Sequence, residues 1–402
     1  MNRKKFSNIC SAFMIIGFFG FVFGLFALSA YENITDYSTY SYYENRNLTM
    51  LPEPDTDSVL DGSFFSKLEN WYKDHVAKRN GVLSYDTFLN MNILRRPVVN
   101  GIVITDDILL PYNKPETVNK DEIDNLAQIM SNRLRGHADK AESCGAEFYY
   151  VAVPCQYVYY EDQYPWYLNS RAEYTKASSE ALFGKLEEKN ISYIDMNEEF
   201  KKLGHLPEFS SAVDNHYGIV GAYETYRTVM ERINEDTDLN IDILEDGEYT
   251  LTELPNPYIG SRTRKLLGQW RYDERLSIIT PNEEIPFTRW NYGNEQPSAS
   301  TVYVMPENEE SRIMYGMYMG DDCSITRIET ERPELPTVLI YGDSFTNAFE
   351  CIVWNSFDTM YSLDFRYYTE MPLDDFIEKV SPDVVICIRD YEALLNLEYN
   401  GC

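Results

Sequence analysis

Basic residues are scarce in this chain. Its 402 residues include 35 Lys and Arg against 65 Asp and Glu, and the formal net charge is -30. A surface with this excess of negative charge repels phosphate backbones, so nucleic acid is excluded as a partner. Anionic lipid surfaces are poor partners as well, except where local basic residues intervene. Histidine is also rare, because the chain holds only four.

The spacing of the cysteines shows no pattern typical of a metal site or of a disulfide framework. The seven cysteines form no CxxC pair and no repeated interval. The pattern therefore indicates neither a metal cage nor a small disulfide framework. The remaining composition, with 44% hydrophobic and 25% charged residues, is ordinary for a globular protein. A chain of this length can form one large α/β domain with appendages.

The amino terminus carries one long uncharged segment. After "MNRKK", the run from Ile9 to Ala30 is long enough in helical form to cross a hydrocarbon core. Basic residues precede the run and Glu32 follows it, which predicts a cytoplasmic tail and an extracellular remainder. We therefore expect a single-pass protein of the cell membrane, with residues 1–30 as tail and anchor. The alternative is a signal peptide cleaved after Ala30, but the run exceeds the usual length of such peptides.

Residues 31–95 are expected to separate this anchor from the main domain. The Tyr- and Asn-rich segment from Tyr31 to Pro54 shows no helical or strand period and predicts an irregular stem. Two amphipathic helices follow. The first is marked by apolar residues at helical spacing, namely Phe64, Phe65, Leu68, Trp71 and Tyr72.

Residues 96–402 alternate between strand-like and helix-like segments. The strand candidates are "AEFYYVAVP", "ISYIDM", "TVLIY" and "DVVICI", and helical patterns occupy residues 120–142, 172–188 and the segment after Ile219. This alternation predicts an α/β domain whose mostly parallel sheet is covered on both faces. The alternation stops between about Asp242 and Pro333, which predicts a large, β-rich insertion before the "TVLIY" strand.

One serine lies where such a sheet places its functional groups. Ser344 follows the buried strand in "PTVLIYGDSFTNAFE" and precedes a helix, whose N-terminus can stabilise an oxyanion. A serine nucleophile needs a base. His216 lies in "VDNHYGIVGA", and Asp214 is two residues earlier, on the same side of an extended segment. We expect Asp214, His216 and Ser344 to form a triad.

Each of these motifs also has a purely structural interpretation. Asp and Ser are common turn and cap residues, so a GDS triplet alone does not establish a nucleophile, and Asp343 completes the turn more readily than it assists catalysis. The aromatic segment "VPCQYVYYEDQYPWY" suits either sugar stacking or core packing. Its aromatic candidates are Tyr157, Tyr159, Tyr160, Trp166 and Tyr167.

Together these motifs resemble the DHHW family, membrane-anchored relatives of the alginate O-acetylation proteins. The resemblance covers most of the chain after the anchor and rests on "ENRNLTMLPEP", "DGSFFSKLENWYKDHVAKRN", "VDNHYGIVGA", "YIGSRTRK", "MYMGDD" and "LIYGDSF". It implies a three-layer domain similar to SGNH hydrolases, in which the Asp and His precede the Ser. It also implies that Ser344 is the nucleophile, His216 the base and Asp214 the residue that orients the base.

The chain departs from the family pattern at two places. The motif that names the family reads Asp214-Asn215-His216-Tyr217 here, so that its second and fourth letters differ. A block with Gly followed by Asn-Asp, as in SGNH hydrolases, is also missing. The second oxyanion donor therefore stays open between Asn347, Arg389 and a backbone N–H.

These features predict an enzyme that moves an acetyl group to or from hydroxyls of a cell-surface polysaccharide, either an exopolysaccharide or the cell wall. A sugar acceptor makes it an O-acetyltransferase, and water makes it an esterase. The resemblance implies a membrane-bound O-acyltransferase as acetyl donor, and the chemistry requires no cofactor or metal. Two alternatives stay open. One is an inactive surface protein that binds or assembles glycans, and the other is a GDSL-type lipid esterase with an apolar tunnel for the acyl chain.

Overall fold

The computed structural model describes residues 3–401, except 45, 115–116, 169–170, 271–272, 295 and 300. The chain divides into two compact units. The first comprises Met1–Asn100 and Arg264–Arg271, and the second comprises Gly101–Thr263 and Tyr272–Cys402. From the sequence we expected domain boundaries at residues 30 and 95 and an insertion at residues 242–333. The division into two compact units does not test these boundaries, so they stay predictions.

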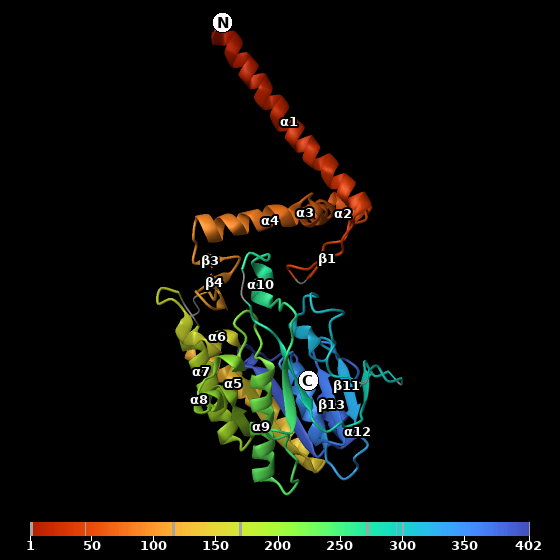
Figure 1. Ribbon diagram of the computed structural model, residues 1–402. Helices are drawn as coiled ribbons and strands as arrows, with labels where there is room; N and C mark the ends of the chain where they lie inside the picture. The colour runs from red at the N-terminus through yellow and green to blue at the C-terminus, as the bar shows by residue number, and fades with distance from the viewer. Residues whose placement is uncertain are drawn as a thin grey trace. The chain divides into compact units, whose positions relative to one another are not determined.

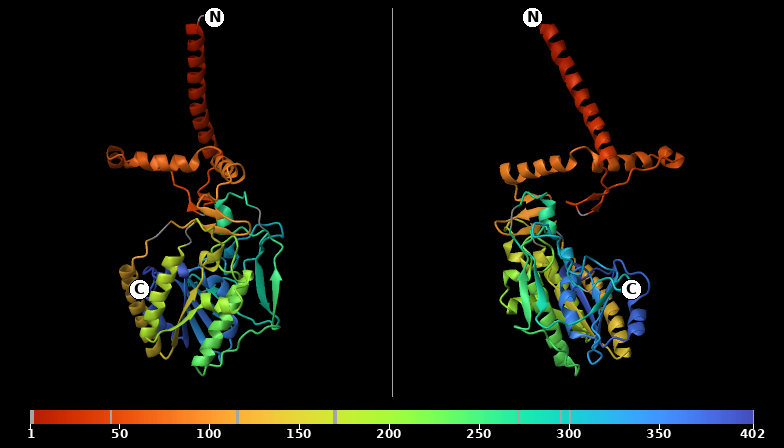
Figure 2. Two further views of the ribbon diagram at one scale, coloured as in Figure 1. Left: turned by 90° about the vertical axis from the view of Figure 1, so that its left-hand side faces the viewer. Right: turned by 45° about the vertical axis from the view of Figure 1, so that its right-hand side comes forward.

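The first unit begins with the long helix α1 (Arg3–Thr35). Its segment Cys10–Thr35 contains an 18-residue stretch with a mean hydropathy of 2.3 and is long and apolar enough to cross a membrane, although a signal sequence would have the same properties. Helix α1 continues beyond Tyr31, where an irregular stem was expected. Figure 2 shows α1, in red, and the orange helices of this unit running in different directions. The other elements are β1 (Tyr40–Ser41), β2 (Arg46–Asn47), α2 (Thr56–Leu60), α3 (Ser63–His75), α4 (Arg79–Phe88), a π-helical turn (Leu89–Ile93) and β3 (Val98–Val99).

The segment between α1 and α2 is held against α3. Strands β1 and β2 pair as a short antiparallel hairpin. The Arg46 guanidinium forms an ion pair with Asp74 at 2.6 Å, and the backbone N–H of Thr49 donates to the same carboxylate at 2.9 Å. The prediction of an irregular stem was therefore wrong in part. The local sequence of this segment shows no periodic pattern, but contacts with residues distant in the sequence hold it in an ordered conformation.

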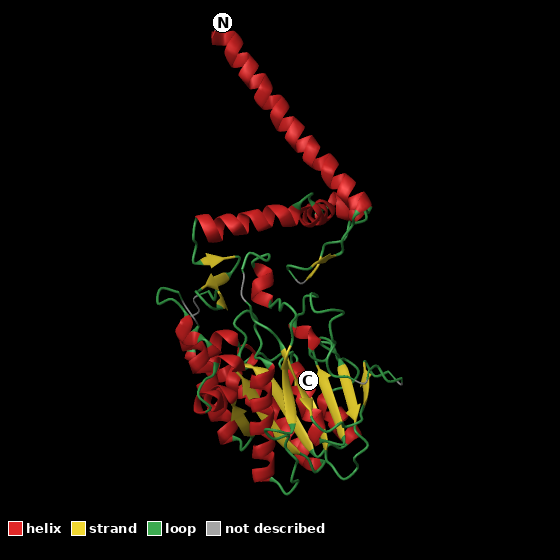
Figure 3. Cartoon of the chain, viewed as in Figure 1, coloured by secondary structure: helices red, strands yellow, loops and turns green. Residues whose placement is uncertain are grey.

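The second unit is built on a seven-stranded sheet in the order β10-β11-β13-β12-β14-β6-β7. Figures 1 and 3 show strands of this sheet side by side, with β11 and β13 labelled in Figure 1. Five adjacent strands, from β13 to β7, are parallel, and β11 and β10 extend the sheet as antiparallel strands. The strands are β6 (Glu147–Val153), β7 (Ser192–Asp195), β10 (Thr288–Asn291), β11 (Ile325–Glu329), β12 (Thr337–Gly342), β13 (Thr359–Asp364) and β14 (Val384–Asp390).

Helices cover both faces of this sheet and make it the middle of three layers. Helices α5, α7 and α12 pack together on one face, and α9 packs with α11 on the other. The helices of this unit are α5 (Lys120–Ser143), α6 (Gln156–Tyr159), α7 (Ala172–Glu188), α8 (Met196–Lys202), α9 (Ile219–Asp236), α11 (Thr346–Val353) and α12 (Leu373–Val380). The expected α/β fold with a mostly parallel sheet is therefore confirmed.

The region between residues 242 and 333 is rich in strands, but it is not separate from the sheet. Strands β8 (Tyr249–Glu253) and β9 (Ser277–Pro281) form an antiparallel pair, whereas β10 and β11 join the main sheet. In β11 alternate residues are buried. That alternation is typical of a strand with one polar face, and it differs from the continuous apolar runs of β12 and β14. The sequence also did not predict strand β13, because "TMYSLD" mixes polar and apolar residues and is not a continuous apolar run.

The core is most continuous in β12 and β14. All residues from Val338 to Tyr341 and from Val384 to Ile388 are fully buried. A Cβ atom at Gly342 would overlap the carbonyl oxygen of Ile388, so glycine lets these two strands approach closely just before the Asp343-Ser344 corner. The end of β12 is therefore held in place by its neighbour.

Replacing Ile340 with Ala should lower the free energy of unfolding by about 2–5 kcal/mol, because the side chain is fully buried in the centre of β12. Leu251→Ala, at an exposed position of β8, is the matched control and should change little. Urea unfolding followed by circular dichroism measures both. Equal effects of the two substitutions would contradict the assignment of β12 to the core.

Candidate active site

Ser344 lies at the turn between β12 and α11, at the carboxyl ends of the parallel strands. The Asp343 carboxylate accepts a hydrogen bond from the backbone N–H of Phe345 at 3.0 Å, and the Asp343 carbonyl accepts one from Thr346 N–H at 2.9 Å. Asp343 therefore shapes the turn, in line with the structural role expected for it. The turn presents the Ser344 hydroxyl beside the N-terminus of α11.

Three side chains that are distant in sequence form one chain of hydrogen bonds. The Ser344 Oγ lies 2.7 Å from His216 Nε2, and His216 Nδ1 lies 2.6 Å from the Asp214 carboxylate. Because a carboxylate only accepts, Nδ1 carries the imidazole proton and Nε2 accepts from the serine hydroxyl. The structure thus brings together the three residues expected to form the triad, in the arrangement that general-base activation of a serine requires.

The Asp214 carboxylate is buried and has many donors. It accepts from the backbone N–H of Asn215 at 2.7 Å, from His216 N–H at 3.2 Å, and from Ser261 N–H. Burial by itself would raise the pKa of Asp214, but the hydrogen bond and charge of His216 and the N–H of Ser261 outweigh burial and hold this pKa well below its usual range. Asp214 therefore stays ionised and can stabilise a protonated His216.

Aromatic rings fix the orientation of the His216 imidazole. The ring stacks on Tyr315 with centroids 3.8 Å apart and planes 5° apart, and Phe345 contacts it at 5.1 Å. Tyr217 is buried, and its hydroxyl donates to the Phe345 carbonyl at 2.6 Å. Tyr217 therefore ties the histidine segment to the serine turn and does not face a substrate. Tyr315 lies in a part of the chain where the sequence contained no signal for the site.

A second, half-buried carboxyl supports the segment that carries Asp214. The backbone N–H of Ala212 donates to Glu274 at 2.9 Å, while the Ser211 hydroxyl oxygen accepts from the backbone N–H groups of Val213 and Asp214 at 3.1 and 2.9 Å. Burial raises the pKa of Glu274, the hydrogen bonds from Ser211 and from Ala212 N–H oppose this rise, and the charge of Asp214 adds to it, so that the pKa lies at about 7. Sequence reasoning missed Glu274, since nothing in "QWRYDERL" marks it.

The segment "YIGSRT" completes the surroundings of the triad. Arg262 is buried, and it donates to Asn215 Oδ1 at 2.7 Å and to Gln156 Oε1 at 3.2 Å. A Cβ atom at Gly260 would overlap the Val213 carbonyl oxygen, so this glycine lets Ser261 N–H reach Asp214. Ser261 and Arg262 open the short helix α10 (Ser261–Lys265), whose last two residues are assigned to the first unit.

The candidates for the second oxyanion donor have other partners. Asn347 is buried in the first turn of α11, and its side-chain amide donates to Asp322 at 3.1 Å. Arg389 is buried, donates to the Tyr399 carbonyl at 3.1 Å and lies 3.7 Å from the Asp343 carboxylate. Both side chains therefore have structural roles around the serine turn in this arrangement.

Most of the aromatic segment after β6 is core. Tyr157, Tyr159 and Tyr160 are buried, and the hydroxyls of Tyr159 and Tyr160 donate to backbone carbonyls. Trp166 and Tyr167, by contrast, are exposed. The sugar-stacking interpretation thus fails for the buried tyrosines, Tyr157 among them, because a ring in the core cannot meet a sugar.

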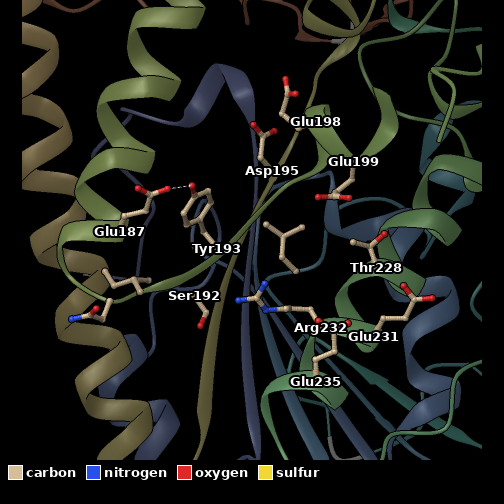
Figure 4. Close-up of a pocket in the computed structure, with 13 residues that line it drawn as sticks. Glu187, Ser192, Tyr193, Asp195, Glu198, Glu199, Thr228, Glu231, Arg232 and Glu235 are labelled. Atoms are coloured by element: carbon tan, nitrogen blue, oxygen red, sulfur yellow. Dashed lines mark hydrogen bonds between the residues drawn. The ribbon is translucent and has the colours of Figure 1, made fainter. Parts of the chain in front are cut away.

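A wide groove of the second unit lies away from the triad. A groove of about 770 Å³ follows β7, the last strand of the sheet, and its walls come from α7, α8 and α9 (Figure 4). Carboxylates dominate its lining, including Glu187, Glu198 and Glu235. None of the three triad residues lines it, so the candidate active site rests on the hydrogen-bonded triad and not on the size of a cavity.

Stability should depend on pH through Glu274. Its pKa of about 7 in the fold exceeds the ordinary value of 4.5, so the stabilisation is present below about pH 4.5 and is lost as the pH rises through about 7. The difference corresponds to about 3 kcal/mol. Urea unfolding of the natural protein and of Glu274→Gln, at about pH 5 and about pH 8, tests this. The natural protein should weaken more at the higher pH, and an equal pH dependence of both proteins would contradict the assignment.

Comparisons with known proteins agree with this architecture. A family model described as "DHHW protein" matches residues 44–153. A search of curated proteins found no match. Among solved structures, Bacillus cereus PatB1 with a sulfonyl adduct is similar with a TM-score of 0.61 and 20% identity, over 75% of this chain and 97% of PatB1.

A second solved structure links the fold to the family. A DHHW family protein from Eubacterium siraeum matches with a TM-score of 0.56 and 17% identity, over 76% of this chain and 95% of that protein. The family match at 44–153 ends before Asp214, so it leaves the roles of the triad residues to the geometry. The resemblance to the DHHW family is thus confirmed over residues 44–153, and the α/β fold of the second unit is shared with these two solved structures.

Proposed function

We propose that this chain is an extracytoplasmic serine-dependent enzyme that transfers acetyl groups to hydroxyls of a cell-surface polysaccharide. The observation that carries the proposal is the unbroken hydrogen-bond chain from the Asp214 carboxylate through His216 to the Ser344 hydroxyl. A buried structural histidine needs no serine at its second nitrogen and no helix N-terminus beside that serine. An acyl-transfer site needs both.

The first half of the reaction acylates the enzyme. His216 Nε2 takes the proton of the Ser344 hydroxyl as Oγ attacks the acetyl carbonyl, and Asp214 stabilises the imidazolium. The tetrahedral intermediate collapses with cleavage of the bond to the donor oxygen, which leaves with the proton from His216. Acetyl-Ser344 remains. Each proton that His216 takes is returned in the same half-reaction, as general acid–base catalysis requires.

The oxyanion of the intermediate is expected at the N-terminus of α11. Among the hydrogen bonds of the described residues, the backbone N–H of Ser344 has no acceptor, whereas those of Phe345 and Thr346 are taken by Asp343. The free Ser344 N–H is thus available to the oxyanion, supported by the helix dipole. Because Asn347 and Arg389 bond elsewhere, a second backbone N–H is the favoured partner donor.

In the second half a sugar hydroxyl gives its proton to His216 and attacks acetyl-Ser344. The proton then returns to Ser344 Oγ as the ester bond breaks. Water in place of the sugar gives hydrolysis, and both reactions use the same three residues. The family resemblance favours transfer, since the DHHW family is related to the alginate O-acetylation proteins. The fold neighbour PatB1 is consistent with a reactive site, because one of its structures carries a sulfonyl adduct.

The proposal also covers the surroundings of the enzyme. The apolar helix α1 is expected to anchor residues 31–402 on the outer side of the membrane, residues 31–95 to connect the anchor, and residues 96–402 to form the catalytic domain. Acetyl-CoA is not present outside the cell, so a membrane-bound O-acyltransferase that passes acetyl outward is the proposed donor. The acidic surface, with a net charge of -30, supports a neutral glycan as the substrate over nucleic acid.

Ser344→Ala and His216→Ala should each abolish turnover of a small chromogenic acetyl ester, with a loss of at least about 10³-fold, because nucleophile and base act as a unit. The full-length protein in detergent is compared with both variants, after circular dichroism has shown that they fold. Ser143→Ala, at an exposed serine of α5, is the matched control and should keep full activity. Activity that survives in Ser344→Ala would overturn the proposed nucleophile.

Asp214→Asn should lower kcat by about 10³- to 10⁴-fold while the fold is retained, because an amide can accept or donate and no longer holds the Nδ1–H tautomer of His216. Substrate binding does not involve Asp214, so KM should change little. Steady-state kinetics with the same ester separates the two constants. A rise in KM with unchanged kcat would show instead that Asp214 shapes the substrate site.

A further inference from the structure

One surface of the first unit is apolar and exposed. Helix α4, the π-helical turn that follows it and the next residue, Leu94, present four large apolar side chains to the outside. Their exposed fractions are 64% for Val82, 63% for Tyr85, 62% for Ile93 and 58% for Leu94. We call these four residues the α4 apolar face. Single exposed apolar residues are common, but a row of them along one helix indicates a surface that is covered in the working protein.

The opposite side of α4 is already packed. Thr87 is buried, and its hydroxyl accepts from the Asn100 side chain at 2.9 Å, while Ser84 accepts from Gln269 at 2.7 Å. These partners belong to the same unit. A surface helix usually turns its apolar side toward the core. Helix α4 does the opposite, since its polar side chains contact the rest of the unit and its large apolar side chains are exposed. Ordinary core packing does not explain such an arrangement.

Hydrogen bonds pin the start of α4 to the end of the apolar helix α1. The Ser29 hydroxyl accepts from Ala77 N–H at 2.9 Å, and the Glu32 carboxylate accepts from Lys78 N–H at 3.1 Å and pairs with Lys78 Nζ at 2.7 Å. The uncharged run ends at Ala30, between these two contacts. The junction of α3 and α4 is therefore held at the level where the span leaves the hydrocarbon layer.

We propose that the α4 apolar face inserts into the outer headgroup layer of the membrane that α1 spans. The inference rests on the proposed anchoring by α1, and it adds a second, peripheral membrane contact. A helix that begins at the hydrocarbon boundary and exposes Val, Tyr, Ile and Leu matches the interfacial helices of peripheral proteins, which bury one apolar face by roughly 5–10 Å. Tyrosine is favoured at that depth, because its ring is apolar and its hydroxyl stays hydrated.

The charges beside the apolar face fit a lipid surface better than a second copy of this chain. Arg95 and Arg96 are exposed directly after Leu94, where long basic side chains can reach phosphate groups. Asp86, on the same helix, accepts a hydrogen bond from Asn90 at 2.9 Å. In a chain with a net charge of -30, this local pair of arginines adds positive charge beside the apolar row, and each arginine near an anionic lipid surface is attracted to it.

Such a contact would have a mechanical consequence. An extended polypeptide leaving a single span can swing freely, whereas two membrane contacts fix the orientation of the first unit relative to the bilayer. Two membrane contacts also bind the membrane more firmly than one. The inference thus assigns a function to α4 and its π-helical turn, which the proposed acetyl transfer does not use.

Photocrosslinking of the full-length protein tests the inference. A benzophenone amino acid replaces Val82, Ile93 or, on the exposed polar side of α3, Lys67. The proteins are reconstituted into vesicles of equal parts phosphatidylcholine and phosphatidylglycerol, irradiated and analysed for lipid adducts by mass spectrometry. We expect several-fold more lipid adduct at positions 82 and 93 than at position 67.

A fourth variant, with the same probe at Phe18 inside the apolar run of α1, separates the two claims. Lipid adducts at 18 without adducts at 82 and 93 would overturn the interfacial contact and leave the anchor standing. No lipid adducts at any position would overturn both the anchor and the inference that rests on it. Crosslinks from 82 and 93 to a second copy of the chain would show that a protein covers this face. Circular dichroism confirms that each variant folds.

Discussion

The candidate site depends on one buried carboxylate and the donors that keep it charged. Asp214 is removed from water, which by itself favours the neutral acid, and only its hydrogen bonds to His216 and to backbone N–H groups reverse that preference. Loss of these donors would neutralise Asp214, release the His216 tautomer and leave Ser344 without a base. The surrounding structure brings His216 and the backbone N–H groups to Asp214 and keeps water away from this carboxylate.

The fold supplies them from three distant parts of the chain. His216 and Ser344 are 128 residues apart, yet the parallel strands bring their loops to one edge of the sheet. Tyr217 then ties the two loops together through the Phe345 carbonyl. The segment around Gly260 and Ser261 closes the third side. Glycine at position 260 is needed because any larger residue would collide with the Val213 carbonyl and move the Ser261 N–H away from Asp214.

Sequence reasoning was strongest where the signal was local. Helix α9 and the strands β12 and β14 follow directly from helical periodicity and continuous apolar runs. Strands β11 and β13, which alternate or mix polar residues, could not be recognised without their partners. The triad geometry was expected because Asp214 and His216 lie two residues apart and Ser344 ends a strand. Glu274 and Tyr315 could not be found in this way. Each reaches the site from the region after residue 242, and only the folded chain shows that its side chain lies near Asp214 or His216.

The two units place different demands on the chain. In the second unit the candidate triad requires a rigid site shielded from water. In the first unit the exposed apolar residues suit a bilayer surface. The account as a whole depends most on Ser344 acting as a covalent nucleophile. The direct test is to stop the reaction of the full-length protein with an acetyl ester by acid and to identify acetylated peptides by mass spectrometry. The account predicts one acetyl group on Ser344, which is absent in Ser344→Ala. Turnover without acetyl-Ser344, or with the acetyl group on another residue that forms and decays at the rate of turnover, would contradict it.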